Sequence, residues 1–223
     1  MENKRLTLFA GHYGSGKTNI AVNYAIKLSK EGKKVCIADL DIVNPYFRTK
    51  DSEEELKAHG IDLISPQYAN TNVDLPALPA ESYRLVQDKS VYGIMDIGGD
   101  DRGAYALGRF VEAIKEENDY SMVFVANCYR PLTATVDGAI EIMREIEAAC
   151  GLNFTCIVNN SNLGNFTTVD TVTDSYGYIN ELCERTGLPL FMHTAVKNVA
   201  DKLTGVPVMP LTLQKKYFDI PEI

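Results

Sequence analysis

Several features of specialised proteins are missing from this sequence of 223 residues. It has no tryptophan, no dense cluster of lysine and arginine, and a formal net charge of −8 at pH 7. That balance argues against a dedicated nucleic-acid binder. No apolar run approaches the roughly 18 residues of a membrane-spanning helix, and the first residues lead into a strand-like run rather than a signal-peptide core. We therefore expect a cytoplasmic protein with no membrane span.

Cysteine is scarce, and its positions form no metal-binding pair. The five cysteines are an odd number, with no C-x-C or C-x-x-C spacing among them. Reduced, mostly buried thiols are therefore expected. An iron–sulfur or zinc site assembled from distant positions, or across a dimer, stays open as an alternative.

Short apolar runs alternate with segments of helical periodicity, which is typical of an α/β fold with a mostly parallel central sheet and helices on both faces. Length and an ordinary composition, 45% hydrophobic and 23% charged, favour one domain over residues 1–223. About seven strands are expected, near residues 5–10, 34–39, 61–64, 91–96, 120–126, 154–159 and 189–193. Two apolar stripes that predict helices are Val136, Ala139, Ile140, Met143 and Cys150, and Val172, Tyr176, Ile179 and Leu182.

The phosphate-binding loop pattern G-x-x-x-x-G-K-[ST] matches one segment, Gly11-His12-Tyr13-Gly14-Ser15-Gly16-Lys17-Thr18. It follows an expected strand and precedes a helical period, which is the context that a functional match requires. In such a loop successive backbone N–H groups face one phosphate cluster at the start of a helix. Lys17 would reach the β- and γ-phosphates, and the Thr18 hydroxyl would bind Mg²⁺.

Two acidic strand ends are expected beside this loop. Asp39-Leu40-Asp41 follows the second expected strand, and Asp96-Ile97-Gly98-Gly99-Asp100 follows the fourth. Phosphoryl chemistry needs a divalent cation and a placed water, and carboxylates can hold both. The spacing Asp96-x-x-Gly99 is typical of a Walker B and switch II element. Asp96 would then hold Mg²⁺ through water, and the Gly99 N–H would bond the γ-phosphate.

These motifs together resemble the MinD/ParA class of P-loop ATPases, which includes the nitrogenase iron protein and metallocentre-insertion ATPases. The resemblance covers nearly the whole chain and implies the P-loop NTPase fold. It implies that Asp41 orients or deprotonates the attacking water and that Asp39 supports Mg²⁺. It also places Asn159 where the class reads adenine, and the segment 199–208 where its backbone lines the base pocket. Because no N-K-x-D guanine motif is present, ATP is expected rather than GTP.

One departure from the class concerns His12. Members that hydrolyse ATP as a face-to-face dimer carry K-G-G-x-G-K-[ST], whose first lysine reaches the partner's nucleotide, and His12 occupies that lysine's position. An imidazole is shorter than a lysine side chain and mostly neutral at pH 7. This counts against the cross-dimer mechanism. A cation could instead come from Arg48, Arg102 or Arg130 acting as an arginine finger, and Arg48 is expected first.

The leading hypothesis is a nucleotide-switch ATPase. ATP and Mg²⁺ would order the loops at 41–50 and 97–103 for an unknown protein partner, and a nucleotide-dependent homodimer stays open as a second kind of partner. A first alternative is a P-loop kinase or ligase whose acceptor pocket is built by the loop at 65–80. A second alternative is a module that binds ATP with little turnover.

Overall fold

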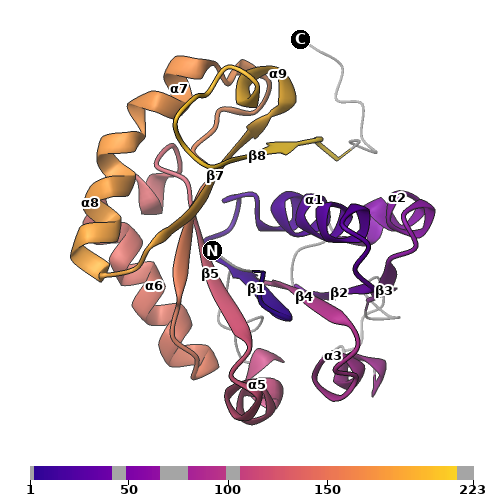
Figure 1. Cartoon of the computed structure of the whole chain (residues 1–223). Helices are drawn as coiled ribbons and strands as arrows, with labels where there is room; N and C mark the ends of the chain where they lie inside the picture. The colour runs from indigo at the N-terminus through magenta and orange to yellow at the C-terminus, as the bar shows by residue number, and fades with distance from the viewer. Residues whose placement is uncertain (1–2, 42–48, 66–79, 99–105, 215–223) are drawn as a thin grey trace, which may run out of the picture.

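The structure is a computed structural model that describes residues 3–41, 49–65, 80–98 and 106–214 (Figure 1). Over these ranges it contains one eight-stranded sheet with the strand order β3-β2-β4-β1-β5-β6-β7-β8. Every neighbouring pair of strands is parallel. The strands are β1 (Leu6–Ala10), β2 (Val35–Leu40), β3 (Asp62–Ile64), β4 (Tyr92–Ile97), β5 (Tyr120–Ala126), β6 (Cys156–Asn159), β7 (Leu190–Val196) and β8 (Val208–Leu211).

Helices connect consecutive strands, as parallel pairing requires. The α-helices are α1 (Lys17–Lys30), α2 (Glu53–Ala58), α3 (Arg84–Gln87), α5 (Val111–Glu117), α6 (Val136–Cys150), α7 (Val169–Asp174), α8 (Tyr176–Thr186) and α9 (Lys197–Ala200). Single turns of 3₁₀ helix are η1 (Thr49–Ser52), η2 (Ala80–Tyr83), η3 (Gly108–Phe110), η4 (Pro131–Thr133) and η5 (Gly164–Phe166).

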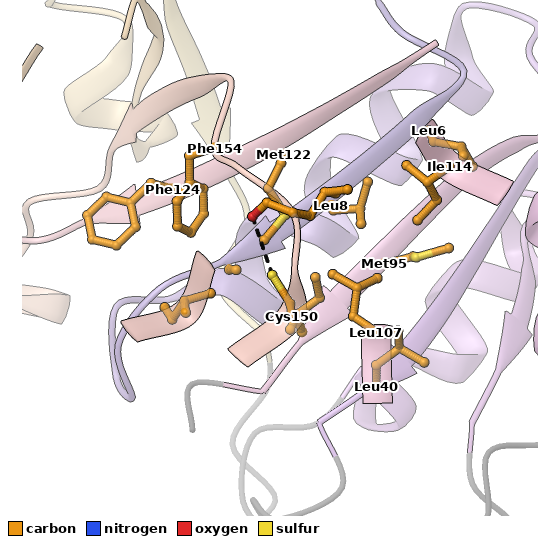
Figure 2. Close-up of a cluster of buried hydrophobic side chains, with 14 of the residues drawn as sticks. Leu6, Leu8, Leu40, Met95, Leu107, Ile114, Met122, Phe124, Cys150 and Phe154 are labelled. Atoms are coloured by element: carbon orange, nitrogen blue, oxygen red, sulfur yellow. Dashed lines mark hydrogen bonds between the residues drawn. The ribbon is translucent and has the colours of Figure 1, made fainter. Parts of the chain in front are cut away.

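Apolar cores lie on both faces of the sheet. On one face α1 and α2 cover the sheet, with Ile20, Tyr24, Leu28 and Leu56 fully buried against the strands. On the other face the core brings together side chains of α3, α5, α6 and α8 (Figure 1). Figure 2 shows part of this second core, where Phe124 and Phe154 meet edge-to-face with centroids 5.2 Å apart. Burial on both faces explains the almost wholly apolar strands read from the sequence.

The α/β fold and the expected strands are confirmed, and two details differ from expectation. The edge strand β8 was not expected, because Pro207 and Pro210 interrupt its short apolar run. Proline is tolerated there because an edge strand has one unpaired side. The stripe from Val172 to Leu182 forms two helices rather than one, since the chain breaks at Ser175 between α7 and α8.

Within the described residues, none of the helices has both the length and the apolar character needed to cross a membrane.

Candidate functional site

The loop between β1 and α1 sits at the middle of the sheet. β1 lies between β4 and β5, so loops leaving the carboxyl ends of these three strands are neighbours. The loop turns tightly, with the Ser15 N–H donating to the His12 carbonyl at 3.1 Å. Helix α1 then starts at Lys17 with no acidic side chain in its first turn. Unopposed N–H groups and a positive helix end favour a bound anion at this point.

Asn160, which follows β6, links this loop by hydrogen bonds to β7. Its side-chain amide donates to the Ser15 carbonyl at 2.6 Å, and its Oδ1 accepts from the Thr194 hydroxyl at 2.7 Å. Gly16 has a φ of +90°, and a Cβ added there would collide with the Asn160 amide nitrogen. Gly16 is therefore required both by its backbone conformation and by this contact. The sequence pattern explains Gly16, but nothing in it points to Asn160.

Lys17 and Thr18 occupy the positions that the motif predicts. Lys17 is only 5% exposed, and its Nζ donates to the His12 carbonyl at 3.3 Å. A neutral carbonyl is a weaker partner for an ammonium group than a phosphate oxygen would be. Thr18 lies near the Asp96 carboxyl and lowers its pKa. The loop, its lysine and the Asp96 carboxyl thus lie close together.

The two acidic strand ends lie side by side on neighbouring strands. Asp39 and Asp96 are register partners on β2 and β4, and both carboxylates are buried. Asp39 Oδ1 accepts from the Asp41 N–H at 3.0 Å. Asp96 Oδ2 accepts from the Thr49 hydroxyl at 2.9 Å. Thr49, a fully buried residue that the sequence interpretation missed, links η1 to the Walker B position.

Burial dominates the electrostatics of Asp96. Desolvation raises the pKa of its carboxyl to about 6, against the opposing effects of Lys17 and of hydrogen bonds from Thr18 and Thr49. Its Oδ1 is buried without a hydrogen-bond partner in the described part of the chain. A buried carboxylate oxygen that lacks a donor is costly unless a cation binds nearby. Mg²⁺ prefers one or two carboxylates together with phosphate and water oxygens, so Thr18, Asp39 and Asp96 form a donor set that fits it.

The raised pKa of Asp96 predicts a pH-dependent stability. The folded protein binds this proton more tightly than the unfolded chain, so the stabilisation is complete below pH 3.8 and is lost as pH rises through about 6. A shift of this size corresponds to about 3 kcal/mol. Asp96→Asn should therefore make the metal-free protein more stable than wild type above pH 6, measured as the free energy of unfolding in urea. The gain should shrink as pH falls toward 3.8, and a pH-independent difference would contradict the prediction.

Asn159 belongs to a buried polar network. It is fully buried, its amide nitrogen donates to the Ser175 hydroxyl at 2.8 Å, and the same nitrogen lies 3.0 Å from Nδ1 of His193. Its Oδ1 accepts from the Ser161 N–H at 3.1 Å. Burial lowers the pKa of His193, which suits a neutral ring that accepts from Asn159. This network includes Ser175 at the boundary between α7 and α8, and the adenine-reading role of Asn159 stays a prediction.

Some of the sequence-predicted residues fall outside the described ranges. These are Arg48, Gly99, Arg102 and most of the loop at 65–80. Asp41 is described, 8% exposed, at the end of β2 beside the first of these gaps. His12 has its pKa lowered, first by burial and then by Lys17. This direction agrees with a neutral imidazole at the position of the class's signature lysine.

The cysteines are free thiols spread over the fold. Cys36, Cys150 and Cys156 are buried, and Cys128 and Cys183 are half-buried. In the described part of the chain, no group of three or more His, Cys, Asp and Glu side chains is arranged to hold a metal ion.

Comparisons with known proteins agree with this geometry. The family model described as the CobQ/CobB/MinD/ParA nucleotide binding domain matches residues 6–161. No curated protein has a sequence that matches this chain.

Solved structures share the fold at low identity. The cell division protein FtsY of Thermotoga maritima is 19% identical with a TM-score of 0.60, covering 85% of this chain and 61% of its own. The signal recognition particle receptor FtsY of Elizabethkingia anophelis in complex with GDP is 15% identical with a TM-score of 0.54, covering 94% and 61%. A nucleotide-binding protein of Archaeoglobus fulgidus in complex with ADP is 15% identical with a TM-score of 0.50, covering 86% and 81%. This chain thus spans about three fifths of the FtsY chains.

Proposed function

Because the chain belongs to the CobQ/CobB/MinD/ParA family of nucleotide-binding domains, we propose that it binds ATP with Mg²⁺ and hydrolyses it as a conformational switch for a protein partner. Residues 11–18 would hold the phosphates, with Lys17 on the β- and γ-phosphates. Thr18, Asp39 and Asp96 would hold the cation. Asp41 would orient the attacking water, and the Gly99 N–H would contact the γ-phosphate.

One observation supports this proposal most: two buried strand-end carboxylates lie as register partners, on strands next to the one that leads into the glycine-rich loop 11–18. A phosphate site alone would need only the loop and the helix end. Buried acids next to it would repel an anion unless a cation came between them. The arrangement therefore favours a Mg²⁺–nucleotide complex over simple anion binding.

The contact between Thr49 and Asp96 supports a switch. Thr49 follows the segment 42–48, and its hydroxyl is bonded to the carboxylate that would hold the cation. A cation at Asp96 would compete for the same oxygen or reorient the carboxylate. Binding and release of the Mg²⁺–nucleotide complex would then break and restore the hydrogen bond of Thr49 at the start of η1. Local contact changes of this kind operate switch loops.

The hydrogen bonds of Asn159 favour adenine as the base. Its amide nitrogen already faces two acceptors, Ser175 and His193, whereas its Oδ1 accepts one bond from Ser161. The remaining capacity of the side chain is to accept one more hydrogen bond. The exocyclic amino group of adenine is a donor, while the O6 of guanine at the equivalent position is an acceptor. Asn159 is fully buried in this structure, so reading a base would require its Oδ1 to become exposed, and that remaining acceptor would then suit ATP better than GTP.

Exposed apolar side chains near the loop support a protein partner. Tyr13, Leu132, Leu163 and Phe166 are exposed, the last at 84%. They lie in segments that follow β1, β5 and β6, which are neighbouring strands. The phosphate loop leaves the same carboxyl ends of the strands. Apolar side chains gathered at one edge mark an interaction surface more often than scattered ones do. A second copy of this chain is one such partner, and the solution mass with and without ATP tests it.

Titration calorimetry with ATP and GTP, each with and without Mg²⁺, tests the nucleotide proposal. We expect Mg²⁺-dependent binding of ATP, weaker binding of GTP, and slow phosphate release from ATP when no other acceptor is present. Phosphate release that requires a small-molecule acceptor would favour the kinase or ligase alternative. Absence of binding to either nucleotide would reject the proposal.

A further inference from the structure

Arg130 lies against the phosphate loop. It follows β5, the neighbour of β1, so its loop and the phosphate loop leave the same edge of the sheet side by side. A Cβ placed on Gly14 would lie 3.7 Å from Nε of Arg130 and 3.9 Å from its Cδ and Cζ. The guanidinium therefore packs directly on the turn of the loop that precedes Ser15.

The backbone around Arg130 is held by hydrogen bonds. The Asn127 carbonyl accepts from the Arg130 N–H at 3.2 Å and from the Thr133 hydroxyl at 2.7 Å. The Arg130 carbonyl accepts from the Thr133 N–H at 3.0 Å, and Pro131 begins the η4 turn. Nearby, the Cys128 N–H donates a hydrogen bond to the Ser161 hydroxyl at 3.1 Å. The position of Arg130 is thus set by the turn rather than by its own side-chain contacts.

The Arg130 side chain has a buried hydrogen-bond donor that lacks an acceptor among the described residues. Nε of Arg130 is buried and has no hydrogen-bond partner in the described part of the chain. A buried donor on a charged group is unfavourable when it has no acceptor. A phosphate oxygen is an acceptor that a guanidinium binds especially well. The adjoining loop is the place where the proposed function puts phosphates.

We propose that Arg130 binds the terminal phosphates of the nucleotide from within the same chain and stabilises the charge that develops during hydrolysis. This inference rests on the proposed nucleotide site. It assigns to Arg130 the arginine-finger role that the sequence suggested first for Arg48. The phosphate oxygens would supply the acceptor that Nε lacks, and the guanidinium would add a second cation beside Lys17.

The test compares Arg130→Ala and Arg130→Lys with wild type and with Arg144→Ala. Arg144 is a matched control, because its side chain is 69% exposed on α6 and paired with Glu147. For Arg130→Ala we expect affinity for a non-hydrolysable ATP analogue to fall about tenfold, ADP affinity to fall less, and turnover to fall by about 10³-fold. Arg130→Lys should recover binding more than turnover, because lysine keeps the charge without the planar fork.

A purely structural role for Arg130 predicts a different result. Loss of a structural contact would lower the Tm of the nucleotide-free protein, whereas removing a side chain whose buried Nε lacks an acceptor within the described ranges should leave the Tm unchanged or raise it. If Arg130→Ala binds and hydrolyses ATP like wild type while Lys17→Ala has lost the nucleotide, the role of Arg130 is rejected and the proposed function stands. If wild type binds no nucleoside triphosphate, the proposed function fails and the inference falls with it.

Discussion

Lys17→Ala should abolish nucleotide binding. Lys17 is 5% exposed and its ammonium group donates to the neutral His12 carbonyl, an acceptor that phosphate oxygens could replace. Loss of a desolvated, charge-assisted contact to two phosphates is expected to weaken affinity by about 10²-fold or more. Titration calorimetry with Mg²⁺–ATP measures the effect directly.

Lys27→Ala is the matched control for this substitution. Lys27 lies in the last turn of the same helix, is 44% exposed and pairs with Glu31. Surface pairs of this kind contribute about 0–1 kcal/mol, so the control should bind ATP like wild type. Retained affinity in Lys17→Ala, in a protein with an unchanged circular dichroism spectrum, would remove Lys17 from the phosphate site.

Asp41→Asn should preserve binding and lose turnover. The residue is buried at the end of β2, and its charge raises the pKa of the neighbouring Asp96. An amide at this position removes that repulsion, so the cation site should not be weakened. An amide cannot accept the proton of an attacking water, and loss of a general base costs about 10²–10⁴-fold in rate. Single-turnover phosphate release, measured beside ATP affinity, separates the two effects.

Asp119→Asn provides the comparison for Asp41→Asn. Asp119 precedes β5, at the amino ends of the strands and so on the side of the sheet opposite the phosphate loop, and it pairs with Lys4 at 3.4 Å. This variant should hydrolyse ATP at the wild-type rate. Wild-type turnover in Asp41→Asn would show that some other group activates the water.

Local signals in the sequence predicted most of the fold. Apolar runs of strand length mark a two-sided parallel sheet, because such strands are buried on both faces. The apolar stripe from Val136 to Cys150 predicted helix α6. Thr135 caps its amino end, and Gly151 ends it in the left-handed region. The phosphate loop and its acidic neighbours were readable because their spacing is short and their flanks are regular.

Contacts between residues far apart in the sequence could not be predicted. Thr49 and Asp96 are 47 positions apart, and Asn159 and His193 are 34 apart. Nothing local distinguishes Thr49 from an ordinary surface threonine, or His193 from an isolated histidine. Arg130 was one of three candidate loop arginines, with Arg48 expected first, until the topology placed β5 beside β1. The break at Ser175 interrupts an apolar stripe that is otherwise continuous, so periodicity alone reads it as one helix.

Asn160 also has a consequence for the order of folding. Its partners Ser15 and Thr194 are 145 and 34 residues away along the chain. Closing long loops costs entropy that must be met before distant contacts can form. A nascent chain that has completed α1 therefore carries every residue of the motif, yet the Ser15 carbonyl is not held until β6 and β7 have docked. The proposed phosphate site would in this sense be completed late, as a property of the assembled sheet.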